Sequence, residues 1–285
     1  MRDIYTLKSP QNPHSCVVFN SPHSGSAYPA EFMASTKLDS LAIRSSEDAF
    51  VNELFKDAPE HGAHLLYAHA PRAFIDLNRS ATELDPAIVQ GAIRAPANPR
   101  IAAGLGVIPR IVGNGQVIRT GKIPMTEARN RIASYYTPYH SCLRNLIDMQ
   151  RGIHGMAVLI DCHSMPQKSL KAAPLVRGKQ PDIILGDRFG ASCDRWIMDA
   201  ATQILAAAGF VVARNAPFSG GYITQHYGRP SKGVHAFQIE INRALYMDET
   251  RVERAETFDK IAETLSDVTR QLAKIGPAST ALAAE

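Results

Sequence analysis

The sequence predicts an α/β fold, in which a central β-sheet is covered by helices on both faces. Two observations support this fold class. Apolar strand-like runs alternate with amphipathic helical stretches along the chain, and neither an internal repeat nor a clean linker divides it. With 285 residues, 45% of them hydrophobic, the chain is long enough for one large domain. We therefore expect a single domain over residues 1–285.

The elements follow from the apolar periodicity and from the glycines and prolines that interrupt it. Strands are predicted at 14–20, 63–68, 72–78, 156–164, 182–187, 210–215 and 235–242. Helices are predicted at 40–62, 126–150, 193–209 and 249–276. The run MAVLIDCHS (156–164) is apolar on both faces and is expected at the centre of the sheet. Residues 82–124 are predicted to form a long irregular excursion near the site, and 277–285 a frayed tail.

The composition excludes several classes of protein. The net charge is only +4, and no run of Lys and Arg forms a stripe, so we expect no nucleic-acid partner. No apolar run reaches the roughly 18 residues of a membrane span, and the first residues lack a signal peptide's apolar core. These features predict a cytoplasmic protein with no membrane partner, and leave the oligomeric state open. Free thiols are expected at the four scattered cysteines, which form no C-x-x-C pair.

Two histidines stand where strands give way to loops, and reactive groups gather at such strand ends in open α/β sheets. His23 follows the first predicted strand, and His163 closes the central one. Catalytic zinc takes three protein ligands from His and Asp or Glu, which leaves a fourth position for water. Asp48 is our preferred acidic ligand and Glu47 the competing choice, because adjacent residues on a helix point about 100° apart.

Each of these residues also has a structural interpretation. His23 taken alone is typical of a polar loop residue. Acidic side chains in the first turn of a helix, as expected for Glu47 and Asp48, complement its dipole without any function. His163 has support for the functional interpretation, because Asp161, two residues earlier, is a suitable hydrogen-bond acceptor that would orient a ligand histidine.

Glu240 lies inside the otherwise apolar run FQIEIN, where an unpaired charge would be costly. One interpretation is a buried ion pair with Arg243 or another arginine. The functional interpretation makes Glu240 the general base, which takes a proton from the attacking water and delivers it to the leaving amine.

Basic residues gather around the segment PRAFIDLNRS. Arg72, Asn78 and Arg79 are candidates for holding a substrate carboxylate, because the planar guanidinium suits bidentate capture. An ion pair with Asp76 is the structural alternative for Arg72.

Three further positions are weaker candidates. Gly220 and Gly221 would let backbone N–H groups approach a ligand closely, although a turn explains them equally well. His140 on a predicted helix is a candidate substrate contact. Cys162 beside His163 suggests a thiol hydrolase, but neighbours on a strand point to opposite faces, so the two side chains cannot easily pair.

Seven motifs follow one another along the chain: SPHSG (21–25), SEDAFVNELF (46–55), PRAFIDLNRS (71–80), YHSCL (139–143), IDCHSMP (160–166), PFSGGYITQHYGRP (217–230) and QIEINRALYMDE (238–249). In this order they resemble the N-formylglutamate amidohydrolase family over roughly residues 14 to 270. The resemblance implies a three-layer, mixed central sheet of the phosphorylase/hydrolase-like kind, distantly similar to zinc carboxypeptidases and succinylglutamate desuccinylase.

The resemblance also implies a site. One Zn²⁺ would be bound by His23, His163 and either Asp48 or Glu47, with Glu240 as the base. The carboxypeptidases hold a substrate carboxylate with an Asn-Arg pair, to which Asn78-Arg79 is similar. Their first His and acid share one H-x-x-E motif, whereas 25 residues separate His23 from Asp48 here (48 minus 23). The identity of the acid therefore stays open.

The implied activity is hydrolysis of the amide bond of a small anionic N-acyl amino acid. N-formyl-L-glutamate, which yields formate and L-glutamate, is the first choice and would suggest a role in histidine breakdown. The alternatives are a metal-dependent amidase for another N-acyl amino acid or peptide-like amide, and a small-molecule binding protein that lacks chemistry.

Overall fold

The structure is a computed structural model that describes residues 3–93 and 98–277. By its internal contacts the chain divides into two compact units. The first comprises the described residues of Met1–Thr6, Pro22–Ala49 and Tyr67–Cys142, and the second those of Leu7–Ser21, Phe50–Leu66 and Leu143–Glu285. Among the described residues, no helix has both the length and the apolar character that a membrane crossing requires.

The strands and helices are short except around the centre of the chain and near its end. The strands are β1 (Tyr5–Lys8), β2 (Val17–Ser21), β3 (His64–Ala68), β4 (Ala157–Met165), β5 (Ile183–Gly186), β6 (Val212–Arg214), β7 (Val234–Asn242), β8 (Met247–Asp248) and β9 (Glu253–Arg254). The α-helices are α1 (Ala30–Ser35), α2 (Val51–Leu54), α3 (Pro99–Ala102), α4 (Met125–Arg131), α5 (Thr137–His154), α6 (Arg195–Ala207), α7 (Tyr222–Tyr227) and α8 (Phe258–Leu272). Tighter or wider turns are η1 (Ala42–Ser46), η2 (Ala58–His61), η3 (Ile132–Tyr136), η4 (Gln167–Ala172), η5 (Pro230–Lys232) and η6 (Arg243–Leu245).

Seven strands form one sheet in the order β1-β3-β2-β4-β7-β5-β6. Strand β4 pairs in parallel with β2 on one side and with β7 on the other. Strand β5 runs antiparallel to β7 and parallel to β6, so the sheet is mixed. Every residue of β4 is buried, which confirms the central strand predicted at 156–164 and the predicted mixed α/β fold.

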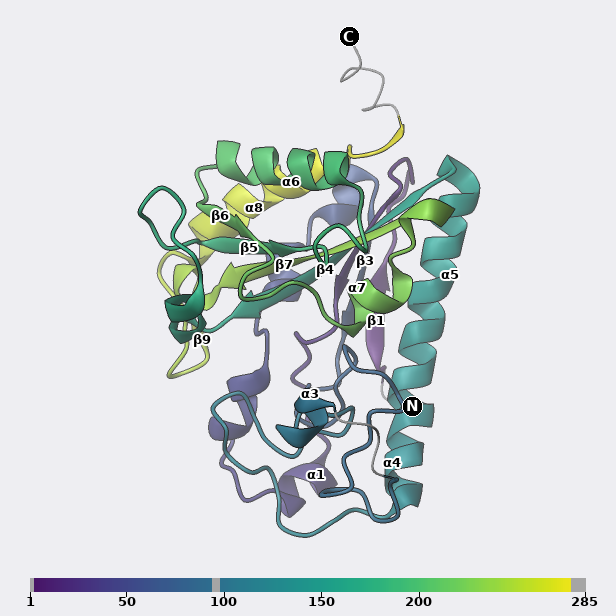
Figure 1. Cartoon of the computed structure of the whole chain (residues 1–285), viewed down its shortest axis with the longest axis vertical. Helices are drawn as coiled ribbons and strands as arrows, with labels where there is room; N and C mark the ends of the chain where they lie inside the picture. The colour runs from purple at the N-terminus through teal and green to yellow at the C-terminus, as the bar shows by residue number, and fades with distance from the viewer. Residues whose placement is uncertain (1–2, 94–97, 278–285) are drawn as a thin grey trace. The chain divides into compact units, whose positions relative to one another are not determined.

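Helices lie on both sides of this sheet within the second unit. Figure 1 shows α6 and α8 lying over one face of β5, β6 and β7. Helix α7 packs against β4 and β7 and lies on the other side of these strands in the same view. The core between them is aliphatic and aromatic, with Phe237, Ile239, Ile197 and Leu265 all fully buried.

The first unit contains little regular secondary structure. Its segment 82–124 has one short helix, α3, and isolated bridges such as Val89 to Ile123 and Ile111 to Val117. Buried aliphatic side chains nevertheless give it a core of its own, including Ile88, Val107 and Val112. The described residues of 82–124 are therefore largely irregular, and residues 94–97 lie outside them.

Two of the sequence predictions for this half of the chain are wrong. Residues 40–62 form three separate turns, η1, α2 and η2, in place of one helix, because Phe50 adopts a left-handed conformation (φ 65°) that stops helical propagation. Residues 72–78 form turns and no strand. The N–H groups of Phe74 and Ile75 both bond to the carbonyl of Pro71, and the Asp76 side chain accepts from the N–H of Asn78.

Two predicted helices also differ in detail. The segment predicted at 126–150 contains a π-helical turn, η3, between α4 and α5. The last helix begins at Phe258 and not at 249, because Asp248 accepts from Thr250 and opens the turn between β8 and β9. The remaining predicted strands and α6 agree with the structure within a few residues. Most of the tail, residues 278–285, lies outside the described residues, and the single-domain organisation stays a prediction.

Candidate active site

His23 lies two residues after the end of β2, in a turn that packs tightly on the backbone of residues 69–70. A Cβ atom at Gly25 would come within 2.3 Å of the carbonyl oxygen of Ala70, so only glycine fits there. The N–H of Ala27 bonds to the carbonyl of His69 at 2.9 Å. These contacts fix the loop that carries His23, whose side chain is 2% exposed.

Asp48 is brought to His23 through the backbone. Its N–H bonds to the carbonyl oxygen of His23 at 3.0 Å, which spans the 25 residues that separate the two in the sequence. The two side chains are also in contact. Oδ2 of Asp48 lies 3.4 Å from Nδ1 of His23, and both groups are buried.

The other ring nitrogen of His23 is held by Asp76. Nε2 donates to Oδ1 of Asp76 at 2.7 Å, and Oδ2 accepts from Nε of Arg72 at 3.0 Å. Burial opposes ionisation of Asp76, but Arg72, His23 and Arg79 outweigh it and hold the pKa of this carboxyl well below its usual range. The carboxylate is therefore a fixed acceptor that directs Nδ1 of His23 toward Asp48.

His163 is oriented in the same manner from β4. Its Nε2 donates to Oδ2 of Asp161 at 2.8 Å, because side chains two residues apart lie on one face of a strand. Oδ1 of Asp161 accepts from Nδ2 of Asn20, its partner in register on β2, at 2.7 Å. The predicted Asp161–His163 contact is confirmed, and it leaves Nδ1 as the ring nitrogen of His163 that can bind a metal.

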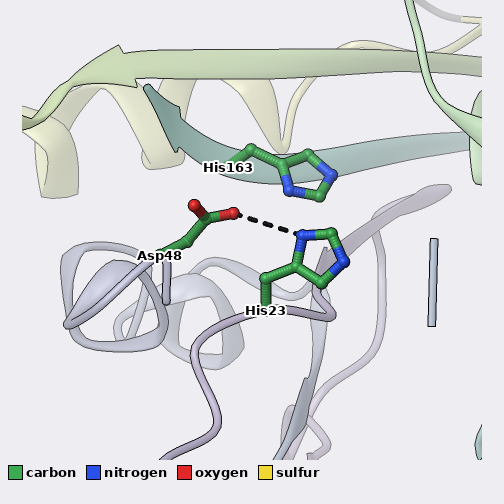
Figure 2. A group of neighbouring side chains, drawn as sticks. All are labelled: His23, Asp48 and His163. Atoms are coloured by element: carbon green, nitrogen blue, oxygen red, sulfur yellow. Dashed lines mark ion pairs between the residues drawn. The ribbon is translucent and has the colours of Figure 1, made fainter. Parts of the chain in front are cut away.

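His23, Asp48 and His163 form a buried group in which one ligand atom from each lies within 4.8 Å of the others. Figure 2 shows their side chains pointing toward one another, with the His23–Asp48 contact dashed. Two ligand atoms that are each about 2 Å from a tetrahedral ion stand roughly 3.3 Å apart. The 3.4 Å between His23 and Asp48 matches that spacing. Two imidazoles and a carboxylate, with both Nε2 atoms bound to carboxylates, fit the ligands that zinc prefers.

Glu240 lies on β7, and its Cα is in register with that of His163 on the neighbouring strand β4. Partners in register on neighbouring strands project to the same face of a sheet, so both side chains project from the same face. Gln238 lies one pleat earlier and donates Nε2 to Oε1 of Glu240 at 3.2 Å. Arg243, considered as its ion-pair partner, donates Nε to Oγ of Ser164.

Glu47 takes part in a different set of contacts. Its carboxylate accepts from the hydroxyl of Tyr28 at 2.7 Å and pairs with the Arg44 guanidinium at 3.0 Å. Burial, followed by the Glu47 charge, raises the pKa of the Tyr28 hydroxyl far above its usual value. The buried group that could hold a metal ion contains Asp48 and does not contain Glu47.

The three residues proposed to hold a substrate carboxylate differ in exposure, because Arg72 is partly exposed while Asn78 and Arg79 are buried. Arg72 keeps 26% of its side chain exposed while it pairs with Asp76, as its structural alternative required. Arg79 is buried, with Nε donating to the carbonyl of Leu105 and Nη1 to that of Asn78. The N–H of Asn78 bonds to Asp76, so all three residues belong to the surroundings of that carboxylate.

The weaker candidates have other contacts. Nε2 of His140 donates to the carbonyl of Leu77 at 2.9 Å. Gly220 needs its positive φ of 137°, and Gly221 precedes α7. Cys162 is fully buried, and burial raises the pKa of its thiol well above the usual value, which disfavours a thiolate nucleophile. All four cysteines are free, as predicted.

The residues that the sequence did not assign to the site are Asn20, Asp76 and Gln238. Asn20 and Gln238 are the register partners of Asp161 on either side of β4. Polar residues in otherwise apolar strands were the available signal. Asp76 has the same signal in the strand-like run RAFIDLN, but the turn that brings its carboxylate to His23 has no local signature in the sequence.

The mixed sheet, the buried His-Asp-His group that could hold a metal ion, and a carboxylate in register with one of the histidines describe an α/β protein with a candidate metal site. Comparison with known sequences gives the family. A sequence model described as N-formylglutamate amidohydrolase matches residues 15–247. The chain belongs to the N-formylglutamate amidohydrolase family, and the predicted resemblance and enzyme class are confirmed.

Two curated relatives are similar over most of their length. N-formylglutamate deformylase of Pseudomonas aeruginosa is 31% identical over 253 residues, which is 87% of each chain. N-formylglutamate deformylase of Pseudomonas putida is 34% identical over 206 residues, or 71% of each chain.

Solved structures agree with the fold. The crystal structure of N-formylglutamate amidohydrolase from Ralstonia eutropha JMP134 superposes with a TM-score of 0.89 at 32% identity, covering 97% of this chain and 99% of that one. The gene product Atu2144 of Agrobacterium tumefaciens has a TM-score of 0.57 at 18% identity over 94% and 95% of the two chains, which shows a common fold alone.

Proposed function

We propose that the protein hydrolyses N-formyl-L-glutamate to formate and L-glutamate, with zinc bound by His23, Asp48 and His163. The buried His-Asp-His group is the observation that supports a metal-dependent hydrolase most strongly. Family membership and the names of the two Pseudomonas relatives support the choice of substrate. Zinc in such a site supplies a Lewis acid, which polarises a carbonyl and lowers the pKa of water.

The chain's own residues then divide the work. Asp76 and Asp161 keep both imidazoles in the tautomer with the proton on Nε2, so that each Nδ1 can bind the metal. Asp48 supplies the acidic ligand, while Tyr28 and Arg44 hold Glu47 in other contacts.

Glu240 is the general base of the proposal. Its carboxylate takes one proton from the attacking water and delivers it to the nitrogen of glutamate as the amide bond breaks, while the oxygen of the water ends in formate and its second proton protonates the released amine. Gln238 fixes Oε1 of Glu240 by donating to it, which limits the rotation of the carboxylate. The register of β4 and β7 keeps Glu240 beside His163.

Arg72 is the arginine better suited to bind a substrate carboxylate, because a quarter of its side chain stays exposed and Asp76 fixes its guanidinium. Arg79, Asn78, His140, Gly220 and Gly221 remain proposed contributors to substrate binding. Binding of the substrate carboxylate at a fixed position would use binding energy to orient the formyl group of the substrate.

A substrate panel with controlled metal content tests this function. We expect formate release from N-formyl-L-glutamate by the zinc-loaded protein, with kcat/KM at least about tenfold above that for deacylation of N-acetyl- or N-succinyl-L-glutamate. Chelation should abolish turnover and added zinc should restore it. Equal rates on all three amides would overturn the substrate, and full activity of the metal-free protein would overturn the metal.

A further inference from the structure

The helical segment 125–154 widens into one π-helical turn. Helix α4 ends at Arg131, η3 covers Ile132–Tyr136, and the N–H of Thr137 bonds to the carbonyl of Ile132, five residues back. Pro138 gives a reason for this turn. It has no N–H to donate, and its ring excludes the carbonyl four residues earlier, so a regular α-turn cannot form there.

The wider turn changes which side chains share a face. In a regular α-helix, residues 131 and 136 would point roughly 140° apart. A turn closed by an i to i+5 bond takes in one more residue, so residue 136 returns near the face of residue 131. Residue 140 follows four positions later, which is one α-helical turn. Arg131, Tyr136 and His140 therefore line one face, and all three are buried.

Each of these three side chains, which we term the carbonyl clamp, donates to a backbone carbonyl of the segment 74–79. The bonds run from Nη1 of Arg131 to Phe74 (3.0 Å), from the hydroxyl of Tyr136 to Arg79 (2.9 Å), and from Nε2 of His140 to Leu77 (2.9 Å). The Arg131 guanidinium also lies 4.1 Å from the centre of the Phe74 ring. The clamp thus holds the backbone on both sides of Asp76.

Segment 74–79 has no helix or strand to keep it in place, yet it carries the carboxylate that binds Nε2 of His23. The ladder bonds that would fix a strand are absent from this described segment. Side-chain donors replace them, and the N–H of Asp76 adds a bond to the carbonyl of Val107. The three hydrogen bonds of the clamp to this segment end on carbonyl oxygens, so they leave the Asp76 carboxylate available to His23 and Arg72.

We propose that Arg131, Tyr136 and His140 are positioning residues, which hold Asp76 against Nε2 of His23 and so aim Nδ1 of His23 at the metal position. The inference rests on the proposed function, because His23 is a zinc ligand only there. None of the three touches the substrate in this role. We therefore assign His140 mainly to positioning Asp76, in place of the substrate contact considered for it above.

The test compares variants that remove single donors. Tyr136→Phe removes the hydroxyl and keeps the ring, and His140→Leu removes the imidazole donor. Each should weaken zinc binding, measured by competition with a chelator, by about tenfold, since the partners that orient ligands typically contribute 10- to 100-fold to metal affinity. With zinc saturating, kcat should fall several-fold while KM stays within about twofold.

Two further variants separate positioning from general stability. Tyr135→Phe removes a hydroxyl one residue away and keeps the ring that packs on Phe74. The described contacts include no hydrogen bond from this hydroxyl to residues 74–79, so the variant should bind zinc like the wild type. His140→Gln restores a donor of similar reach and should recover most of the affinity lost in His140→Leu. Wild-type zinc affinity and kcat in both Tyr136→Phe and His140→Leu would overturn the inference, whatever their melting temperatures.

One readout does not depend on zinc or turnover. In the metal-free wild type, the Nε2 proton of His23 should give a protected signal in histidine-labelled NMR spectra, because Asp76 binds it. Tyr136→Phe should accelerate its exchange with water at least about tenfold, whereas Tyr135→Phe should not. If the wild type neither binds zinc nor hydrolyses formylglutamate, the proposed function fails, and this signal still decides the positioning role.

Discussion

His23 and His163 make the same contact in two different ways. Each donates Nε2 to a buried aspartate, at 2.7 Å for His23 and 2.8 Å for His163. For His163 the aspartate is two residues away on the same strand, so the pleat of β4 creates the contact. For His23 it is 53 residues away on a segment without regular structure, and the clamp and the Arg72 ion pair must hold it. Local geometry therefore orients His163, and long-range packing orients His23, the two proposed metal ligands.

The largest expected effect comes from removing either histidine. His23→Ala and His163→Ala should each abolish stoichiometric zinc binding and lower kcat/KM by roughly 10⁴-fold, because the Lewis acid contributes several kcal/mol of transition-state stabilisation. Metal analysis and formate release measure both quantities, with circular dichroism as the control for folding. Zinc retained at one ion per chain in either variant would contradict its role as a ligand.

Glu240→Gln should keep zinc and lose turnover. The amide keeps the size of the side chain but cannot accept the proton, so kcat should fall roughly 10²- to 10⁴-fold. Gln238→Glu is not a suitable control, because it places a second charge beside Glu240. Gln238→Leu removes the donor to Oε1 and should cost less than Glu240→Gln. Unchanged kcat in Glu240→Gln would remove it from the mechanism.

Replacing the two aspartates compares the local Asp161–His163 contact directly with the long-range Asp76–His23 contact. Asp161→Asn and Asp76→Asn keep the side-chain shape and remove the charge, and each should lower zinc affinity about 10- to 100-fold. Asp76→Asn should also lower the free energy of unfolding by about 2 kcal/mol more, because Arg72 loses its partner. Chelator competition and urea titration measure these effects. Equal stability of the two variants would show that the long-range contact needs no more support than the local one.

A smaller effect is expected from the loop that carries His23. A Cβ at Gly25 would press on the backbone of residues 69–70, so Gly25→Ala should cost about 2 kcal/mol of stability and several-fold in kcat. Gly152→Ala is the matched control. Nothing lies within 4 Å of its Cβ position, and alanine in helix α5 should stabilise by about 0.5–1 kcal/mol. A Gly25→Ala variant as stable and active as the wild type would refute the tight packing of this loop.

The smallest effect is expected at Cys162, which precedes His163 but projects to the opposite face of β4. Cys162→Ala should leave kcat within about twofold and cost about 1 kcal/mol of stability from lost packing. A loss of activity beyond tenfold, at unchanged zinc content, would revive the thiol-hydrolase alternative.

The sequence predicted best where structure is local. The strand 156–164 was confirmed at the centre of the sheet because an apolar run on both faces has few alternatives. The contact between Asp161 and His163 followed from the period of two along a strand. His23 could be proposed as a ligand because a polar residue shortly after a strand lies at the carboxyl end of the strands, where reactive groups gather in open α/β sheets.

Long-range packing explains what the sequence could not predict. The run RAFIDLN has the alternation of a strand, but Pro71 and the Asp76 side chain form turns there, and the donors that hold the segment lie 57 to 63 residues away. The prediction of one helix at 40–62 is wrong because the chain breaks at Phe50, whose left-handed backbone conformation is not indicated by the helix propensity of the sequence. The meeting of Asp48 with His23 through a backbone bond has no local signature either.

The central claim is that one metal ion is bound through Nδ1 of His23, Nδ1 of His163 and the carboxylate of Asp48. A crystal structure of the zinc-loaded protein, with anomalous diffraction measured on both sides of the zinc absorption edge, tests it most directly. We predict a single strong anomalous peak about 2.0–2.2 Å from these three ligand atoms, with both Nε2 atoms still bound to Asp76 and Asp161. A peak bound by Glu47 or by either Nε2, or no peak in an active protein, would contradict the account.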